Sequence, residues 1–176
     1  MYKVAMFVSS ITGNTKKIAD RLEEELIKAG NQVDRFQTIK AVKDLPKDQY
    51  DMKVVLFWCR RSVMDDASMM LMDLYHDDDF IVIGTMGNYP DSAYGDLVKE
   101  NVIEVVERQN HCVDIFLSQG KIRPERTEAR RKLDPSAPHY LDDEGYKRHL
   151  ESRKHPNEED IQGAIRCVMS HLPEVA

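Results

Sequence analysis

The chain has 176 residues, of which 41 % are hydrophobic and 32 % charged, and its formal net charge is −6. This length suits one domain with its own core, and the composition argues against a disordered or fibrous chain. An apolar run of the roughly 20 residues that span a bilayer is missing, the N-terminus has no signal-peptide pattern, and the acidic balance argues against nucleic-acid binding. We therefore expect a cytoplasmic protein with neither membrane nor nucleic acid as partner.

Five strands are predicted in the first 120 residues. Residues 4–8, 54–58 and 80–83 are continuous apolar runs, which is typical of strands covered on both faces of a sheet. Residues 32–36 alternate apolar and polar side chains, as an edge strand does, and residues 113–117 form the last strand.

Helical periodicity lies between the strands and after the last one. The first helix ends near Gly30, a second covers residues 65–76, a third is capped by Asp91 or Ser92, and a final helix begins at Asn157 or His155-Pro156. The inward faces carry Ile18, Leu22 and Leu26, then Leu97, Val98, Val102, Val105 and Val106, and finally Ile161, Ala164, Ile165, Val168 and Leu172. Strands that alternate with helices predict an open α/β fold with a parallel sheet, in a single domain over residues 1–176.

Residues 121–155 lack clean periodicity, and we expect an irregular segment before the last helix. The segment holds 10 Lys and Arg against 7 Asp and Glu, a net charge of +3, so the rest of the chain carries −9. Because it follows the last strand, it begins at the edge of the sheet where ligands bind in such folds. The segment would present Lys121, Arg123, Arg126, Arg130 and Arg131 to a partner or an anionic substrate, or else it is a solvated excursion.

The first strand runs into a loop of small polar residues that opens a helix. Backbone N–H groups at a helix start lack partners, and the helix dipole favours an anion there. Ser10, Thr12, Asn14 and Thr15 can add donors, and Gly13 permits a positive φ. The spacing fits neither the lysine-containing loop of nucleoside-triphosphate sites nor G-x-G-x-x-G of dinucleotide sites. The residues alone leave a phosphate loop and a plain helix cap equally open.

The stretch Ser10-Ile11-Thr12-Gly13-Asn14-Thr15 resembles the FMN-phosphate loop of the flavodoxin family, [ST]-x-T-G-N-T, and has the same place after the first strand. Residues 45–51 resemble the family's approach to its third strand, and residues 84–89 its second flavin-contacting loop. The resemblance covers roughly residues 1–120 and the final helix. It implies a flavodoxin-like three-layer α/β sandwich with a five-stranded parallel sheet of order 2-1-3-4-5, and FMN as cofactor; flavodoxin is itself a standard example of this topology.

A narrower resemblance joins residues 57–58, 84–92 and 118–122 to a small bacterial subgroup of the family, proteins that accompany larger reductases including bilirubin reductase. The family's pattern implies flavin-binding residues in three loops: Ser9, Ser10, Thr12, Gly13, Asn14 and Thr15 at the phosphate; Trp58, Cys59, Arg60 and Arg61 on one side of the ring; and Thr85, Met86, Gly87, Asn88 and Tyr89 on the other.

An aromatic side chain is expected to stack on the flavin ring. Tyr89 or Trp58 would do so, although Trp58 at a strand end fits a core residue equally well. Flavodoxins usually have a glycine in the loop after the third strand, where this sequence has Arg60 and Arg61. We expect one guanidinium near the N1/O2 edge of the flavin; the alternative is two solvated arginines.

The sequence gives little sign of thiol, metal or nucleophilic chemistry. Cys59, Cys112 and Cys167 lie far apart and are expected to be buried thiols, and the six histidines show no metal-ligand spacing. The methionines at 64, 69, 70 and 72 predict core filling or an adaptable partner surface. No nucleophile-and-base pair is evident, so we predict no catalytic residue and no metal.

The resemblance therefore implies an FMN-binding electron carrier that serves redox partner proteins. One alternative is an FMN-dependent reductase of a quinone or small anionic substrate. Another is a flavodoxin-like interaction module without a cofactor.

Overall fold

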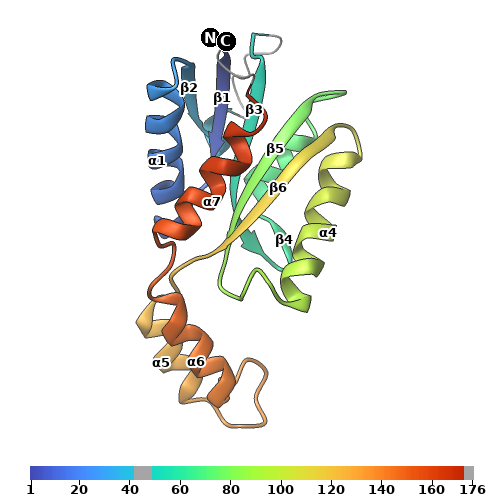
Figure 1. Cartoon of the computed structure of the whole chain (residues 1–176). Helices are drawn as coiled ribbons and strands as arrows, with labels where there is room; N and C mark the ends of the chain where they lie inside the picture. The colour runs from blue at the N-terminus through green and yellow to red at the C-terminus, as the bar shows by residue number, and fades with distance from the viewer. Residues whose placement is uncertain (42–48, 173–176) are drawn as a thin grey trace.

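A computed structural model describes residues 1–41 and 49–172 (Figure 1). Its main strands are β1 (Lys3–Val8), β2 (Gln32–Gln37), β3 (Met52–Arg60), β5 (Asp79–Met86) and β6 (His111–Gln119). All neighbours among them are parallel, in the order β2-β1-β3-β5-β6. Counted along the chain without the short β4, this is the predicted order 2-1-3-4-5, so the fold prediction is confirmed.

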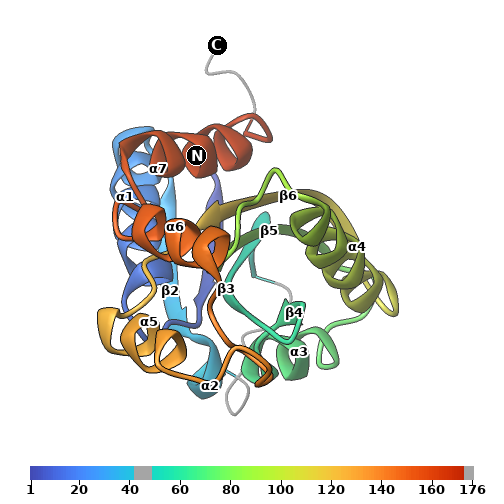
Figure 2. The ribbon, with the colours of Figure 1, turned by 90° about the horizontal axis from the view of Figure 1, so that it is seen from below.

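Helices cover both faces of the sheet (Figures 1 and 2). One face packs against α1 (Asn14–Lys28) and α7 (Glu158–Met169), and the other against α3 (Asp66–Met72) and α4 (Ala93–Glu107). Alternate residues of β1 enter different cores: Val4, Met6 and Val8 join the first, and Ala5 and Phe7 the second. A strand buried on both faces must be apolar throughout, which explains the unbroken run at residues 4–8.

Some local predictions differ from the structure. The helix predicted over residues 65–76 ends at Met72, and α2 (Thr38–Ala41) was not predicted. Leu97, placed on the inward face of α4, is 44 % exposed, whereas its neighbour Val98 is fully buried. Residues 42–48, which include most of the predicted connector before β3, lie outside the described residues.

The segment expected to be irregular forms two helices. α5 (Pro124–Arg131) begins with a proline, and α6 (Asp143–Ser152) is capped by Asp142, whose side chain accepts a hydrogen bond from Gly145 N at 2.7 Å. We call residues 124–152 the α5–α6 hairpin; Figure 1 shows it projecting beyond one edge of the sheet. The prediction was wrong because this hairpin is built largely from polar contacts, which leave no apolar periodicity in the sequence.

Candidate functional site

A cavity of ≈ 690 Å³ lies at the carboxyl edge of the strands. The chain leaves β1 toward β2 on one side and continues with β3 on the other, and ligands of open α/β sheets bind at such a reversal of strand order. Four segments line the cavity: the loop after β1, the ends of β3 and β5, and the chain from β6 into α5. Their lining residues are Ser10, Ile11, Thr12, Asn14 and Thr15; Trp58 and Cys59; Thr85, Met86 and Gly87; and Gly120, Lys121, Ile122, Arg123, Glu125 and Arg126.

The loop after β1 presents unpaired backbone donors. Gly13 has φ +90° and precedes the first residue of α1 without a side-chain cap. Lys16 N donates to Ser10 Oγ at 3.2 Å, whereas the N–H groups of Asn14 and Thr15 have no acceptor within residues 1–41 and 49–172. The helix dipole adds positive potential at this end, so the loop fits a phosphate group.

Two polar side chains of this loop hold the walls of the cavity together. Thr15 is buried; its Oγ1 donates to Phe57 O at 3.2 Å and lies 2.9 Å from the Thr85 hydroxyl. Asn14 Nδ2 donates to Lys121 O, and its Oδ1 accepts from Lys121 N, each at 3.1 Å. These side chains were predicted to donate to a phosphate. The structure instead uses them to join segments, so only their backbone N–H groups stay open to a ligand.

The other end of the cavity is a mainly apolar slot. Trp58 is half-buried there and does not belong to either core. Across the slot, a Cβ on Gly87 would lie 3.1 Å from Ile122 Cδ1, so the glycine allows these segments to approach closely. Gln119 Nε2 fixes this contact by donating to Gly87 O at 3.2 Å. Burial raises the pKa of the Cys59 thiol, which therefore stays protonated at neutral pH.

A buried carboxylate supports the Trp58 side of the cavity. Asp65 is 2 % exposed, accepts from Ser9 Oγ at 2.8 Å and Trp58 N at 3.4 Å, and caps α3 by bonds to Ser68 N and Oγ. Ser9, predicted to bind the cofactor, therefore holds Asp65 and is absent from the cavity lining. Sequence reasoning missed Asp65 as a supporting residue; the spacing Asp65-x-x-Ser68 showed only a helix start.

The two arginines predicted at the flavin point elsewhere. Arg60 forms an ion pair with Asp66, and neither Arg60 nor Arg61 lines the cavity. The cause is the unpredicted strand β4 (Val63–Met64), which pairs antiparallel with the end of β3 and turns the chain back through Arg61 and Ser62. Arg60 lines an adjoining hollow that shares Ser10, Ile11 and Trp58 with the cavity, so a guanidinium at the flavin edge stays a prediction.

Asn88 and Tyr89 are also outside the cavity lining. Asn88 Oδ1 accepts from Tyr89 N at 2.8 Å, and Tyr89 O accepts from Ser92 Oγ at 2.7 Å. These bonds hold the loop against the start of α4, where a Cβ on Gly95 would lie 2.0 Å from Pro90 O. Of the two aromatic candidates, Trp58 is the one at the cavity.

The basic segment contributes a wall of the cavity, as the sequence suggested. Lys121, Arg123 and Arg126 line it, with Glu125 as the single acid among the lining residues. Arg130 is not part of this lining, and Arg131 serves the hairpin, donating to Leu141 O and Asp143 Oδ1 at 2.9 and 2.5 Å. The contributions of Gly120 and Ile122 were not predicted, since their roles depend on where α5 begins.

Within residues 1–41 and 49–172, no group of three His, Cys, Asp or Glu side chains is placed to hold a metal ion. The three cysteines are free and half-buried, and burial raises the pKa of Cys112 to about 11 and of Cys167 to about 12. No helix in the described part of the chain has the length and apolar character needed to cross a membrane.

The fold and the loop after β1 define an open α/β protein with a phosphate-type site at its switch point. A sequence profile of the flavodoxin domain matches residues 5–169, and the chain belongs to the flavodoxin family. The flavodoxin-like domain-containing protein BilS of Clostridioides difficile (strain CD3) is 28 % identical over 170 residues, which cover 92 % of each chain.

Two solved structures share the fold at low identity. The Fusobacterium nucleatum flavodoxin bound to flavin mononucleotide has a TM-score of 0.56 and 12 % identity, over 97 % of this chain and 96 % of that one. An NAD(P)H:quinone oxidoreductase from Methanothermobacter marburgensis has a TM-score of 0.54 and 10 % identity over the full length of both chains.

Proposed function

We propose that this chain binds FMN in the cavity and carries electrons between redox partner proteins. One observation carries the proposal: a single cavity joins the unpaired N–H groups at the start of α1 to an apolar slot beside Trp58. An anion and a flat ring connected by a flexible chain fit such a site. The bound flavin supplies the electron chemistry, and the protein supplies binding and orientation.

The residues at the start of α1 would bind the FMN phosphate through backbone N–H groups and positive charge. The N–H groups of Asn14 and Thr15 point to the anion, and the hydroxyls of Ser10 and Thr12 line the same end. Lys121 is tied to this loop by its bonds to Asn14, so its side chain adds positive charge close by. Charge-assisted hydrogen bonds are the stronger ones, which suits selection for a phosphorylated flavin.

The residues at the slot would hold the ring. Trp58 offers an aromatic face, and a stacked pair of rings contributes about 1 kcal/mol beyond burial. Met86 and Ile122 supply apolar contact and exclude water. Asp65 keeps the backbone of Trp58 in place through its 3.4 Å bond.

A flavin titration tests the site. Quenching of flavin fluorescence should show that the chain binds FMN about tenfold or more tightly than riboflavin, since each charge-assisted hydrogen bond contributes about 1.5–3 kcal/mol. Gly13→Ala, which forces a side chain onto φ +90°, should reduce FMN affinity more than riboflavin affinity. Ser170→Ala, at the exposed C-terminal end of α7, should bind like wild type. Binding of neither flavin would favour the cofactor-free interaction module.

A second candidate is a reductase of a quinone or small anion. The first turn of α5 brings Arg123 and Arg126 to the cavity and gives it a cationic wall against which such a substrate could lie. Steady-state NAD(P)H oxidation distinguishes the two functions. A carrier turns over menadione only when a separate flavoprotein reductase is added. Rapid NAD(P)H oxidation by the FMN-loaded chain alone would contradict the carrier and support the reductase.

A further inference from the structure

Four arginines of the basic segment lack an acidic partner. Arg126 and Arg130 lie one turn apart on α5, Arg148 lies on α6, and Arg153 follows α6 directly. Across residues 1–41 and 49–172, their side chains form no hydrogen bond or ion pair, although Arg131 on the same helix reaches Asp143. We call these four side chains the arginine face.

The four arginines lie within four residues of a buried contact that joins the two helices. His149 is 2 % exposed there, with its Nδ1 2.9 Å from Thr127 Oγ1. Burial and then the charges of the whole arginine face lower the pKa of His149 to about 4. The pKa of Arg130 is lowered by burial and then by the charges of Arg126 and Arg148. The chain therefore concentrates like charges here, and none of its described carboxylates pairs with them.

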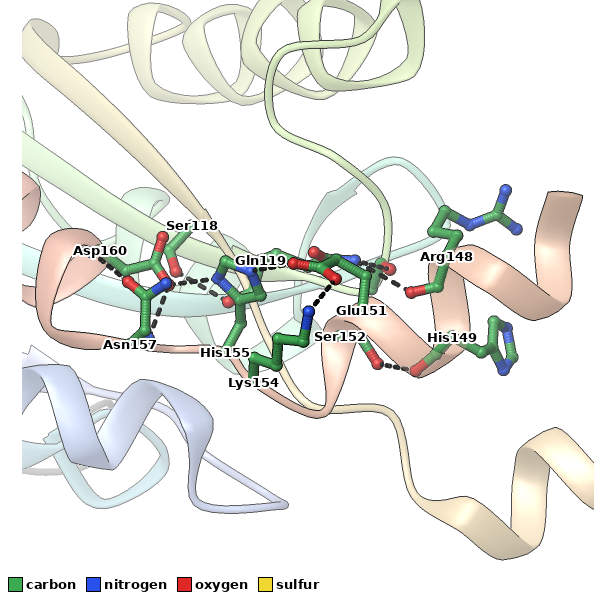
Figure 3. A network of polar contacts seen from close by, with 11 residues as sticks. Ser118, Gln119, Arg148, His149, Glu151, Ser152, Lys154, His155, Asn157 and Asp160 are labelled. Carbon is green, nitrogen blue, oxygen red and sulfur yellow. Dashed lines mark hydrogen bonds and ion pairs between the residues drawn. The ribbon is translucent and has the colours of Figure 1, made fainter.

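The arginine face lies on a projecting element beside the flavin cavity. Few contacts join the hairpin to the body: Ile122 N donates to Ser152 Oγ at 3.0 Å, and Gln119 Nε2 lies 3.5 Å from Arg148 O. Figure 3 shows the contact between Gln119 and Arg148 O beside α6, with the Arg148 guanidinium extending away from it. Arg126 itself lines the cavity, so the arginine face reaches from the cavity wall outward.

We propose that the arginine face is a docking surface for an acidic face of a redox partner protein, which it holds beside the cavity. The proposal rests on the proposed function, because a carrier must bring its flavin close to its partner. Outside residues 121–155 the chain carries −9, so an acidic partner is repelled by the body and attracted at the arginine face. A macromolecule fits better than a small anion, since only Arg126 of the four residues lines the cavity.

The experiment uses a fluorescein-labelled 12-residue peptide with six glutamates, and measures its binding to the full chain by fluorescence anisotropy at low salt. The double variant Arg130→Glu/Arg148→Glu should weaken binding about tenfold or more, because a removed attraction becomes repulsion. The control Lys99→Glu/Arg166→Glu changes the net charge equally, at residues of α4 and α7 that have no ion pair in the described chain. It should stay within about twofold of wild type, as should the charge-conserving Arg130→Lys/Arg148→Lys.

The docking surface and the proposed FMN binding are contradicted by different results. Equal peptide affinity in both charge-reversed variants would overturn the docking surface, provided that circular dichroism shows both to be folded. Complete displacement of the peptide by equimolar pyrophosphate would also overturn it, in favour of a small-anion site. A wild-type chain that binds the peptide but no FMN would contradict the proposed function and leave the docking surface intact.

Discussion

The sheet body and the α5–α6 hairpin are held together by different forces. In the body, one apolar core covers each face of the sheet, and residues 54–57 of β3 are fully buried. In the hairpin, Leu141 is the one apolar side chain that is nearly fully buried, and polar contacts such as Thr127 with His149 join the helices. The body is acidic, whereas residues 121–155, which contain the hairpin, carry a net charge of +3. The hairpin is thus a charged attachment whose stability we expect to be largely separate from that of the body.

Truncating one leucine in each region tests most directly whether the hairpin and the body are stabilised separately. Leu22→Ala removes a fully buried side chain from α1 and should lower the free energy of unfolding by about 2–5 kcal/mol, measured by urea denaturation. Leu141→Ala deletes the same atoms at 3 % exposure in the hairpin. It should leave the main urea transition near the wild-type midpoint and speed hydrogen exchange in the hairpin, because small units can open locally.

The two variants control for each other, since the chemical change is identical. If Leu141→Ala shifts the main transition as far as Leu22→Ala does, the hairpin folds as one unit with the body and the distinction fails.

Apolar burial in the body and polar contacts in the hairpin also differ in how visible they are in the sequence. Core strands such as residues 4–8 were predictable because burial on both faces demands an apolar run. The tight loop after β1 was predictable because Gly13 and its neighbours form a motif with a backbone role. The hairpin was not predictable, since contacts such as Arg131 with Leu141 O depend on a fold that must already exist.

Within the site, backbone roles were easier to predict than side-chain directions. Asn14 and Thr15 line the cavity, but their side chains join Lys121, Phe57 and Thr85. Their partners come from distant parts of the chain, and residue type alone does not identify them. Tyr89 lies outside the cavity lining for a similar reason, because its loop is held against the start of α4.

Acid should loosen the hairpin before the body. His149 has a pKa of about 4 in the folded chain against 6.5 when unperturbed, so its contribution to stability is present at neutral pH and is lost as the pH falls from about 6.5 toward 4. Over that range the unfolded hairpin takes up a proton that the folded one resists. The four arginines facing His149 stay charged throughout and maintain the effect.

Hydrogen exchange measured by mass spectrometry at pH 7 and pH 5, corrected for intrinsic rates, should show reduced protection in peptides from residues 121–155 and little change in β1 and β3. His149→Gln should abolish most of this pH dependence. Equal loss of protection in the body and the hairpin would show that the two regions do not open separately in acid.

The smallest expected effect lies in the body, at the turn between β3 and β4. Arg61 and Ser62 have φ values of 51° and 64°, which L-residues other than Asn and Asp adopt at a cost and which two-residue hairpins usually assign to Asn-Gly. Surrounding contacts hold this conformation: Asn101 Nδ2 donates to Ser62 O at 2.8 Å, and Ser62 Oγ donates to Tyr94 Oη at 3.1 Å.

Ser62→Gly should therefore stabilise the chain by about 0.5–1 kcal/mol, a rise in Tm of about 1–4 °C, since it removes the strain and keeps the carbonyl that Asn101 binds. Ser62→Ala is the matched control: it removes the same hydroxyl but retains Cβ, and should bring no gain. Calorimetry of both variants separates the contributions. If Ser62→Gly has a Tm no higher than that of Ser62→Ala, the turn stores no backbone strain. The absence of a glycine from this loop would then have no energetic cost.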